Sequence, residues 1–117
     1  MPKKPVGAPK PLLTEAMIGS VADIFSALSD PSRLRLLKAL SESADPLSQG
    51  ALAEAAGVSQ ANASKHLALL ARVGLVTRAP EGNTVYYSPV MPLVGNLCDL
   101  VCGHVSLRAK ETFQALR

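Results

Sequence analysis

The chain has 117 residues, of which 48% are hydrophobic, and this is enough for one domain that buries its own core. Only 3% are aromatic and tryptophan is absent, so leucine, alanine and valine must build the core, which favours helices over a sheet-rich fold. The net charge of +3 is too small to indicate nucleic acid as a partner by itself.

From the start of the chain and its apolar runs we expect neither a membrane protein nor a secreted one. No apolar run approaches the roughly eighteen residues that cross a membrane. The opening MPKKPVGAPKPLL has no apolar segment after its lysines, unlike a secretory signal. We therefore expect a cytoplasmic protein with a flexible Pro/Lys tail over residues 1–11 and one domain over residues 12–117. In that reducing compartment the two cysteines are expected to be free thiols, ligands or redox groups.

Two helices are predicted first. From Leu13 to Leu28 apolar residues follow helical spacing on nearly all sides, which indicates contact with a second subunit as well as with the core. In SDPSRLRLLKAL, Asp30 is placed to cap the next helix and Pro31 to occupy its first position. The expected buried stripe of this helix is Leu34, Leu37 and Leu40, with Leu36 beside it.

Two further helices and a hairpin follow. Ser48 can cap a short helix over residues 49–56, and Ser59 can cap another over residues 60–73. Gly57 and Gly74 stand just past the ends of these helices, where a left-handed conformation suits glycine. LVTR and TVYYS, separated by a polar APEGN turn, predict a β-hairpin, and a last helix is expected over residues 93–116.

The third and fourth helices, with the turn at Gly57, predict a helix-turn-helix. The fourth helix begins with small and polar residues, which let a helix end approach the major groove and pair with bases and phosphates. No acidic residue lies between Ala55 and Pro80, which favours phosphate contact over the alternative of an ordinary polar helix face.

The predicted DNA contacts fall into three groups. Gln60 and Asn62 are expected to read base edges. The expected phosphate contacts are Ser59, Ser64 and Lys65, with His66 as a further candidate. Arg78 and Asn83 in the hairpin are expected to contact the flanking backbone.

Three segments resemble the ArsR/SmtB family of winged-helix regulators: LSDPSRLRLLKAL, LAEAAGVSQANASKHLALLARVGLV and EGNTVYYSP, within residues 20–105. The resemblance implies a mainly α fold with a small β-hairpin, a winged helix-turn-helix in the order α-α-α-α-β-β-α. It implies a homodimer through the first and last helices. It also implies a repressor that needs no cofactor to bind a double-stranded DNA operator and is released by an inducer.

An enzyme is not expected, because the chain has no Cys-x-x-Cys pair, no Gly-rich phosphate loop and no plausible Ser/His/Asp set.

The inducer sites known in that family are mostly missing here. Where the family's arsenic-type cysteines begin the third helix, this chain has Ser48, Gly50 and Ala53. The zinc-type set of the last helix retains one matching residue, His104, with Met91, Leu93 and Leu107 at the other positions. We therefore expect both of these sites to be absent.

Cys98 and Cys102 remain as sensor candidates, four residues apart on the last helix. One hypothesis is that they hold a soft metal or metalloid ion, such as arsenite or cadmium, helped by His104 or by the cysteines of a second chain. A thiol redox or persulfide sensor is the second hypothesis. The third is that both cysteines only pack in the dimer interface. The sequence leaves all three open, and it names neither the operator nor the regulated genes.

Overall fold

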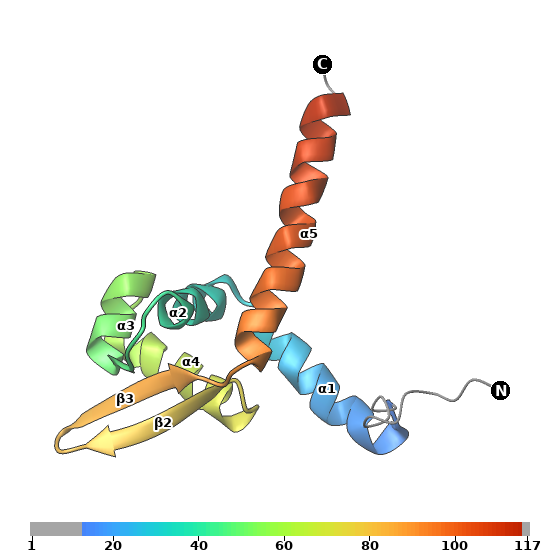
Figure 1. Ribbon diagram of the computed structural model, residues 1–117. Coiled ribbons are helices and arrows are strands. Elements are labelled where there is room, and N and C mark those ends of the chain that lie inside the picture. The colour runs from blue at the N-terminus through green and yellow to red at the C-terminus, as the bar shows by residue number, and fades with distance from the viewer. Residues whose placement is uncertain (1–12, 116–117) are drawn as a thin grey trace.

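The computed structural model describes residues 13–115, and the described chain forms five helices and three strands (Figure 1). In chain order the elements are α1 (Glu15–Leu28), α2 (Pro31–Ser41), β1 (Leu47–Ser48), α3 (Gln49–Ala56), α4 (Gln60–Arg72), β2 (Val76–Glu81), β3 (Thr84–Pro89) and α5 (Leu93–Ala115). This order confirms the expected winged helix-turn-helix and adds one short strand to it. The tail expected over residues 1–11 lies outside the described residues.

Side-chain caps start three of the helices at the predicted residues. Asp30 Oδ2 accepts a hydrogen bond from the backbone N–H of Arg33 at 3.0 Å and so begins α2. Ser48 and Ser59 begin α3 and α4 in the same way, each accepting an N–H three residues further on at 3.1 Å. These bonds satisfy N–H groups that have no partner inside the helix, so the helix starts are encoded locally.

The sheet has three antiparallel strands in the order β1-β3-β2, with Leu47 paired to Tyr87. The two long strands of the wing stay paired from Val76 opposite Pro89 to Glu81 opposite Thr84. The predicted five-residue turn is therefore wrong, because its first three residues belong to β2. Pro80 is tolerated in that strand because β2 is an edge strand, where a missing N–H need not break the ladder.

One hydrophobic core lies between α2, α3, α4 and the base of the sheet. Its fully buried large side chains are Leu36, Leu40, Leu52, Leu67, Leu70, Leu75 and Val94. In α2 the prediction for Leu34 is wrong, because Leu34 is 47% exposed while Leu36 is 0% exposed. The buried stripe lies further around α2 than predicted, because α2 packs against α3, α4 and β3 together. The residues that these contacts bury are Leu36, Leu37 and Leu40.

The helices α1 and α5 extend away from this body (Figure 1). Within the described residues, only Ala27 of α1 and Val94 of α5 are buried. Large apolar side chains on both helices are exposed: Met17, Ile18, Phe25, Leu93, Leu100, Val101, Val105, Leu107 and Phe113. No helix in the described part of the chain is long and apolar enough to cross a membrane.

Candidate nucleic-acid interface

The turn between α3 and α4 has the geometry that the sequence predicts. Gly57 adopts the left-handed conformation, with φ of 69° and ψ of 34°. The N–H of Val58 returns to the carbonyl of Ala53 at 3.0 Å and closes the end of α3. Ala53 and Ala56 are buried, as is Ala63 of α4. These small residues let the two helices pack closely, and a rigid pair of helices results.

The exposed face of α4 carries most of the residues predicted to contact DNA. Ala63, Leu67 and Leu70 point into the core and fix how the helix is rotated. At about 100° per residue, Lys65 then lies nearly opposite that buried stripe. The four exposed predicted residues of α4 are Gln60, Asn62, Ser64 and Lys65. The start of α4 is therefore an exposed helix end that has no acidic residue and presents amide, hydroxyl and ammonium groups.

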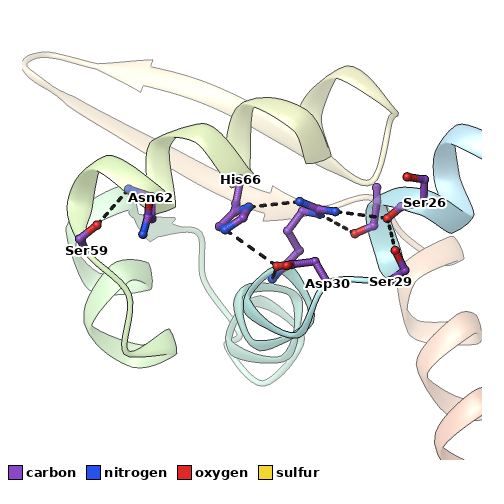
Figure 2. Close-up of polar contacts among 8 residues, drawn as sticks. Ser26, Ser29, Asp30, Ser59, Asn62 and His66 are labelled. Carbon is purple, nitrogen blue, oxygen red and sulfur yellow. Dashed lines mark hydrogen bonds and ion pairs between the residues drawn. The ribbon is translucent and has the colours of Figure 1, made fainter.

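Ser59 serves first as the cap of α4, with its Oγ accepting the N–H of Asn62 (Figure 2). Ser59 is exposed, and a hydroxyl that accepts one bond still has an O–H to donate. The positive end of the α4 dipole lies at the same place and attracts anions. Ser59 can therefore cap the helix and donate to a phosphate at the same time.

His66 is placed differently from the other predicted contacts. Its ring is turned toward Asp30 at the end of α1 and the start of α2 (Figure 2). His66 Nδ1 lies 3.3 Å from Arg33 Nη1, and His66 Nε2 lies 3.9 Å from Asp30 Oδ2. The His66 side chain is 23% exposed. This geometry does not support His66 as a phosphate contact, and it separates His66 from the exposed face of α4.

Two residues near the interface were not predicted from the sequence to take part in it. Arg33 contacts His66 across thirty-three residues of chain, and only its place after the Asp30 cap could have drawn attention to it. Gly50 of α3 faces Gln60, because a Cβ built on Gly50 would lie 3.2 Å from Gln60 Nε2. The absent side chain at Gly50 gives the Gln60 amide its room.

The backbone N–H of Arg33, by bonding to Asp30, lowers the pKa of that carboxyl from its ordinary value of 3.8. The positive charge of Arg33 acts in the same direction. Asp30 is therefore ionised at neutral pH and is the anionic member of the group formed with Arg33 and His66.

The two residues predicted to contact DNA from the wing, the hairpin of β2 and β3, lie at different positions along it. Arg78 is exposed in the middle of β2, opposite Tyr87 of β3. Asn83 is exposed in the turn at the tip, next to Gly82, whose φ is 62°. The carboxylate of Glu81 is also exposed beside this tip and would oppose a phosphate there. Arg78 is therefore the better placed of the two for phosphate contact.

The two cysteines of α5 have different surroundings. Cys98 is half-buried and packs against the hydrophobic core, whereas Cys102 is exposed. His104 is exposed and lies about 160° around the helix from Cys102. Among residues 13–115 no three His, Cys, Asp or Glu side chains are grouped to hold a metal. An ion bound at these cysteines would need donors from outside the described chain.

Comparison with known proteins agrees with this geometry. Residues 28–79 match the family model described as a helix-turn-helix domain. A transcriptional repressor SmtB homolog from Synechocystis is 41% identical over 85 residues, which cover 73% of this chain and 63% of that protein. Over the first curated relatives the match spans 66% and 63% of their length, slightly under two thirds.

Two solved structures cover nearly the whole chain. The homodimeric winged helix-turn-helix DNA-binding domain Mb0332 from Mycobacterium bovis, described as a possible ArsR-family regulator, has a TM-score of 0.76. It is 27% identical and covers 91% of this chain and 94% of its own. The AntR antimony-specific transcriptional repressor has a TM-score of 0.72 at 30% identity, with 94% and 98% covered.

The fold and the exposed α4 face are those of winged-helix transcriptional regulators and not of enzymes. Within this class, the relatives matched by sequence and the solved structures matched by fold indicate the same family. The chain belongs to the ArsR/SmtB family.

Proposed function

We propose that this protein is a transcriptional repressor that binds a double-stranded DNA operator as a homodimer. The observation that carries the proposal is the exposed, acid-free start of α4, a helix whose inner face is buried against the core. A helix of this width and polarity enters a major groove, and its first residues then reach the base edges.

The proposed contacts follow from the exposed groups. The amides of Gln60 and Asn62 offer paired donors and acceptors to base edges. Lys65 and Arg78 supply positive charge to phosphates, and Ser59 and Ser64 supply hydroxyl donors. Asn83 at the wing tip is a flanking contact. His66 is left out of this set because its ring is engaged with Arg33 and Asp30.

The dimer is proposed to form through α1 and α5, so that residues 12–117 act as one DNA-binding and dimerisation domain. Support comes from the exposed apolar side chains of both helices, such as Phe25 at 63% and Leu100 at 73%. Groups of exposed large apolar side chains mark contact sites when they form a contiguous patch, as they would on facing helices of a dimer. The homodimeric state of the Mb0332 domain supports the same assembly.

The inducer is proposed to act at Cys98 and Cys102. Thiolates prefer soft ions such as arsenite and cadmium, and cysteines or His104 of a second chain would complete the ligand set. The antimony-specific repressor AntR supports a metalloid inducer. Ligation would change the dimer geometry, and a coupling of about 1–3 kcal/mol weakens DNA binding about 5- to 150-fold. The exposure of Cys102 favours thiol oxidation as the second candidate signal.

DNA binding is tested by fluorescence anisotropy on a labelled duplex from immediately upstream of the protein's own coding sequence. Asn62→Ala should reduce affinity by about 1–3 kcal/mol and relax sequence preference. Lys65→Ala should weaken binding to all duplexes and reduce the salt slope by about one. Lys38→Ala is the matched control, because Lys38 is an exposed lysine of α2 paired with Glu42. Equal effects of all three variants would contradict the assignment of α4 as the recognition helix.

The dimer is tested by sedimentation equilibrium. Phe25→Glu and Val105→Glu each place a charge on the proposed interface and should shift the protein to monomer. Ala79→Glu in the exposed wing is the control and should leave the mass unchanged. A monomeric wild type, or a dimer unaffected by either interface variant, would contradict the proposed assembly.

The inducer is tested by repeating the anisotropy titration with one equivalent of arsenite or cadmium, and separately after mild oxidation. Loss of DNA binding that disappears in Cys98→Ser combined with Cys102→Ser would support sensing at these thiols. Unchanged binding under all three treatments would mean that the cysteines only pack and that the inducer acts elsewhere.

A further inference from the structure

Arg33 joins the end of α1 to α4. Its Nε donates to the carbonyl of Ala27 at 2.7 Å, and its Nη2 donates to the carbonyl of Ser26 at 3.2 Å. Its Nη1 contacts His66 Nδ1 at 3.3 Å. One planar guanidinium therefore reaches the last turn of α1 with one edge and the middle of α4 with the other. Among the dashed lines of Figure 2, the one that ends at His66 Nδ1 and the one that ends at the carbonyl of Ser26 mark two of these contacts.

The chemistry of these groups fixes the direction of each bond. An arginine side chain can only donate, so His66 Nδ1 must accept and carries no proton. The proton of the neutral ring is then on Nε2, which faces Asp30 Oδ2 at 3.9 Å. Asp30 in turn accepts the backbone N–H of Arg33 at 3.0 Å. The His66 ring therefore lies between the guanidinium of Arg33 and the carboxylate of Asp30, and Asp30 is held in turn by the backbone of Arg33.

These contacts connect α1 and α4, two helices with different proposed roles. Carbonyls at the C-terminal end of a helix carry partial negative charge, and Arg33 binds two of them in α1. The other contacts of α1 with the core are few: Ala27 is its one buried residue within the described chain, and Ile24 and Leu28 are partly buried against the core. A rotation or shift of α1 therefore acts on the guanidinium, and through Nη1 on His66 and α4.

We propose that Arg33 is a positioning residue that transmits movements of α1 to the recognition helix α4 through His66. The proposal rests on the proposed function, in which α1 lies in the dimer interface and α4 enters the operator. It extends that function by giving the route by which a change of dimer geometry alters the angle of α4.

The first test is a double-mutant cycle on affinity for the upstream duplex, with Arg33→Lys and His66→Leu. Lysine keeps the charge but lacks the planar fork, so it cannot bond to α1 and His66 together. Leucine removes the acceptor. Each variant should weaken DNA binding about 5- to 150-fold. The double variant should bind the duplex no more weakly than the single variant that has the lower affinity. Losses that multiply would overturn the proposal and would indicate that each side chain acts on its own.

A rescue variant separates this role from general packing at His66. Gln in place of His66 presents a neutral oxygen acceptor to Arg33, so His66→Gln should keep affinity within about threefold of the wild type. If His66→Gln binds as weakly as His66→Leu, the transmission through an accepted hydrogen bond is rejected. This pair also keeps the test intact if Arg33→Lys does not fold.

A third experiment tests the connection between α1 and α4 in the free protein, without DNA. Amide hydrogen exchange of the free protein should be faster in α4 and in the last turn of α1 for both Arg33→Lys and His66→Leu, and unchanged for Lys38→Ala. If the wild type does not bind the duplex, the proposed function fails, and the exchange result alone decides whether the tie between the helices exists. Unchanged exchange in α4 in all variants would overturn it.

Discussion

Cys98 and Cys102 stand one turn apart on α5, yet Cys98 packs against the hydrophobic core while Cys102 is exposed. The two thiols are therefore not equivalent in the folded chain. Cys98 is anchored to the winged-helix body, and Cys102 points to the surface where a ligand or a second chain can approach.

This difference predicts unequal effects of serine on stability. Cys98→Ser places a hydroxyl in a half-buried apolar site and should lower the free energy of unfolding by about 1–2 kcal/mol. Cys102→Ser should change it by less than about 0.5 kcal/mol, as for other surface substitutions. Urea denaturation at one fixed protein concentration measures both. An equally large loss for Cys102→Ser would show that both thiols pack, as a purely structural role requires.

A second prediction concerns the leucines of α2. Leu36→Ala should lower the free energy of unfolding by about 2–5 kcal/mol, because Leu36 is fully buried and its loss leaves a cavity. Leu34→Ala should cost less than about 1 kcal/mol, because Leu34 is exposed and alanine is the better helix former. Thermal and urea unfolding of this matched pair check the rotation of α2. A larger loss for Leu34→Ala would mean that α2 is rotated differently.

The Asp30 cap predicts a pH dependence of stability. The folded-state pKa of Asp30 is lowered, chiefly by the hydrogen bond from the Arg33 N–H, so folding favours the ionised carboxyl. This contribution is complete above the ordinary pKa of 3.8 and is lost as the pH falls through the lower folded-state value. Asparagine also caps helices but does not titrate in this range.

Between pH 7 and about pH 2, the difference in unfolding free energy between the wild type and Asp30→Asn should therefore shrink once the pH falls below about 4. Urea denaturation across this range measures it. A difference that stays constant down to about pH 2 would contradict the ionised cap.

A fourth prediction separates stability from recognition at Gly50. Alanine is favoured over glycine inside a helix by up to about 1 kcal/mol, so Gly50→Ala should leave α3 as stable or make it more stable. The new Cβ would lie 3.2 Å from Gln60 Nε2 and must displace that amide. If Gln60 reads a base, the same variant should change affinity for the upstream duplex or its sequence preference.

The matched control for Gly50→Ala is Gln60→Ala in both backgrounds. Once Gln60 is shortened, the substitution at Gly50 should have no further effect on DNA binding. A loss of affinity that persists in the Gln60→Ala background would show that Gly50 acts through the backbone of α3 instead.

The sequence by itself determined the helix starts and the class of fold. Caps at Asp30, Ser48 and Ser59 act on an N–H three residues away, and the left-handed Gly57 closes α3 within the same few residues. Such interactions are local, so spacing along the chain is enough to predict them. The small and polar start of α4 is local in the same sense, and it carried the prediction of a recognition helix.

Tertiary structure decided what depends on distant partners. The orientation of α2 is set by packing against three other elements, so Leu36 and not Leu34 is buried. The two-residue strand β1 exists because β3 pairs with it from forty residues further on. His66 meets Arg33 only because α2 and α4 cross in the fold. The sequence pattern of a single helix cannot predict these contacts, because each depends on how separate elements pack together around the core.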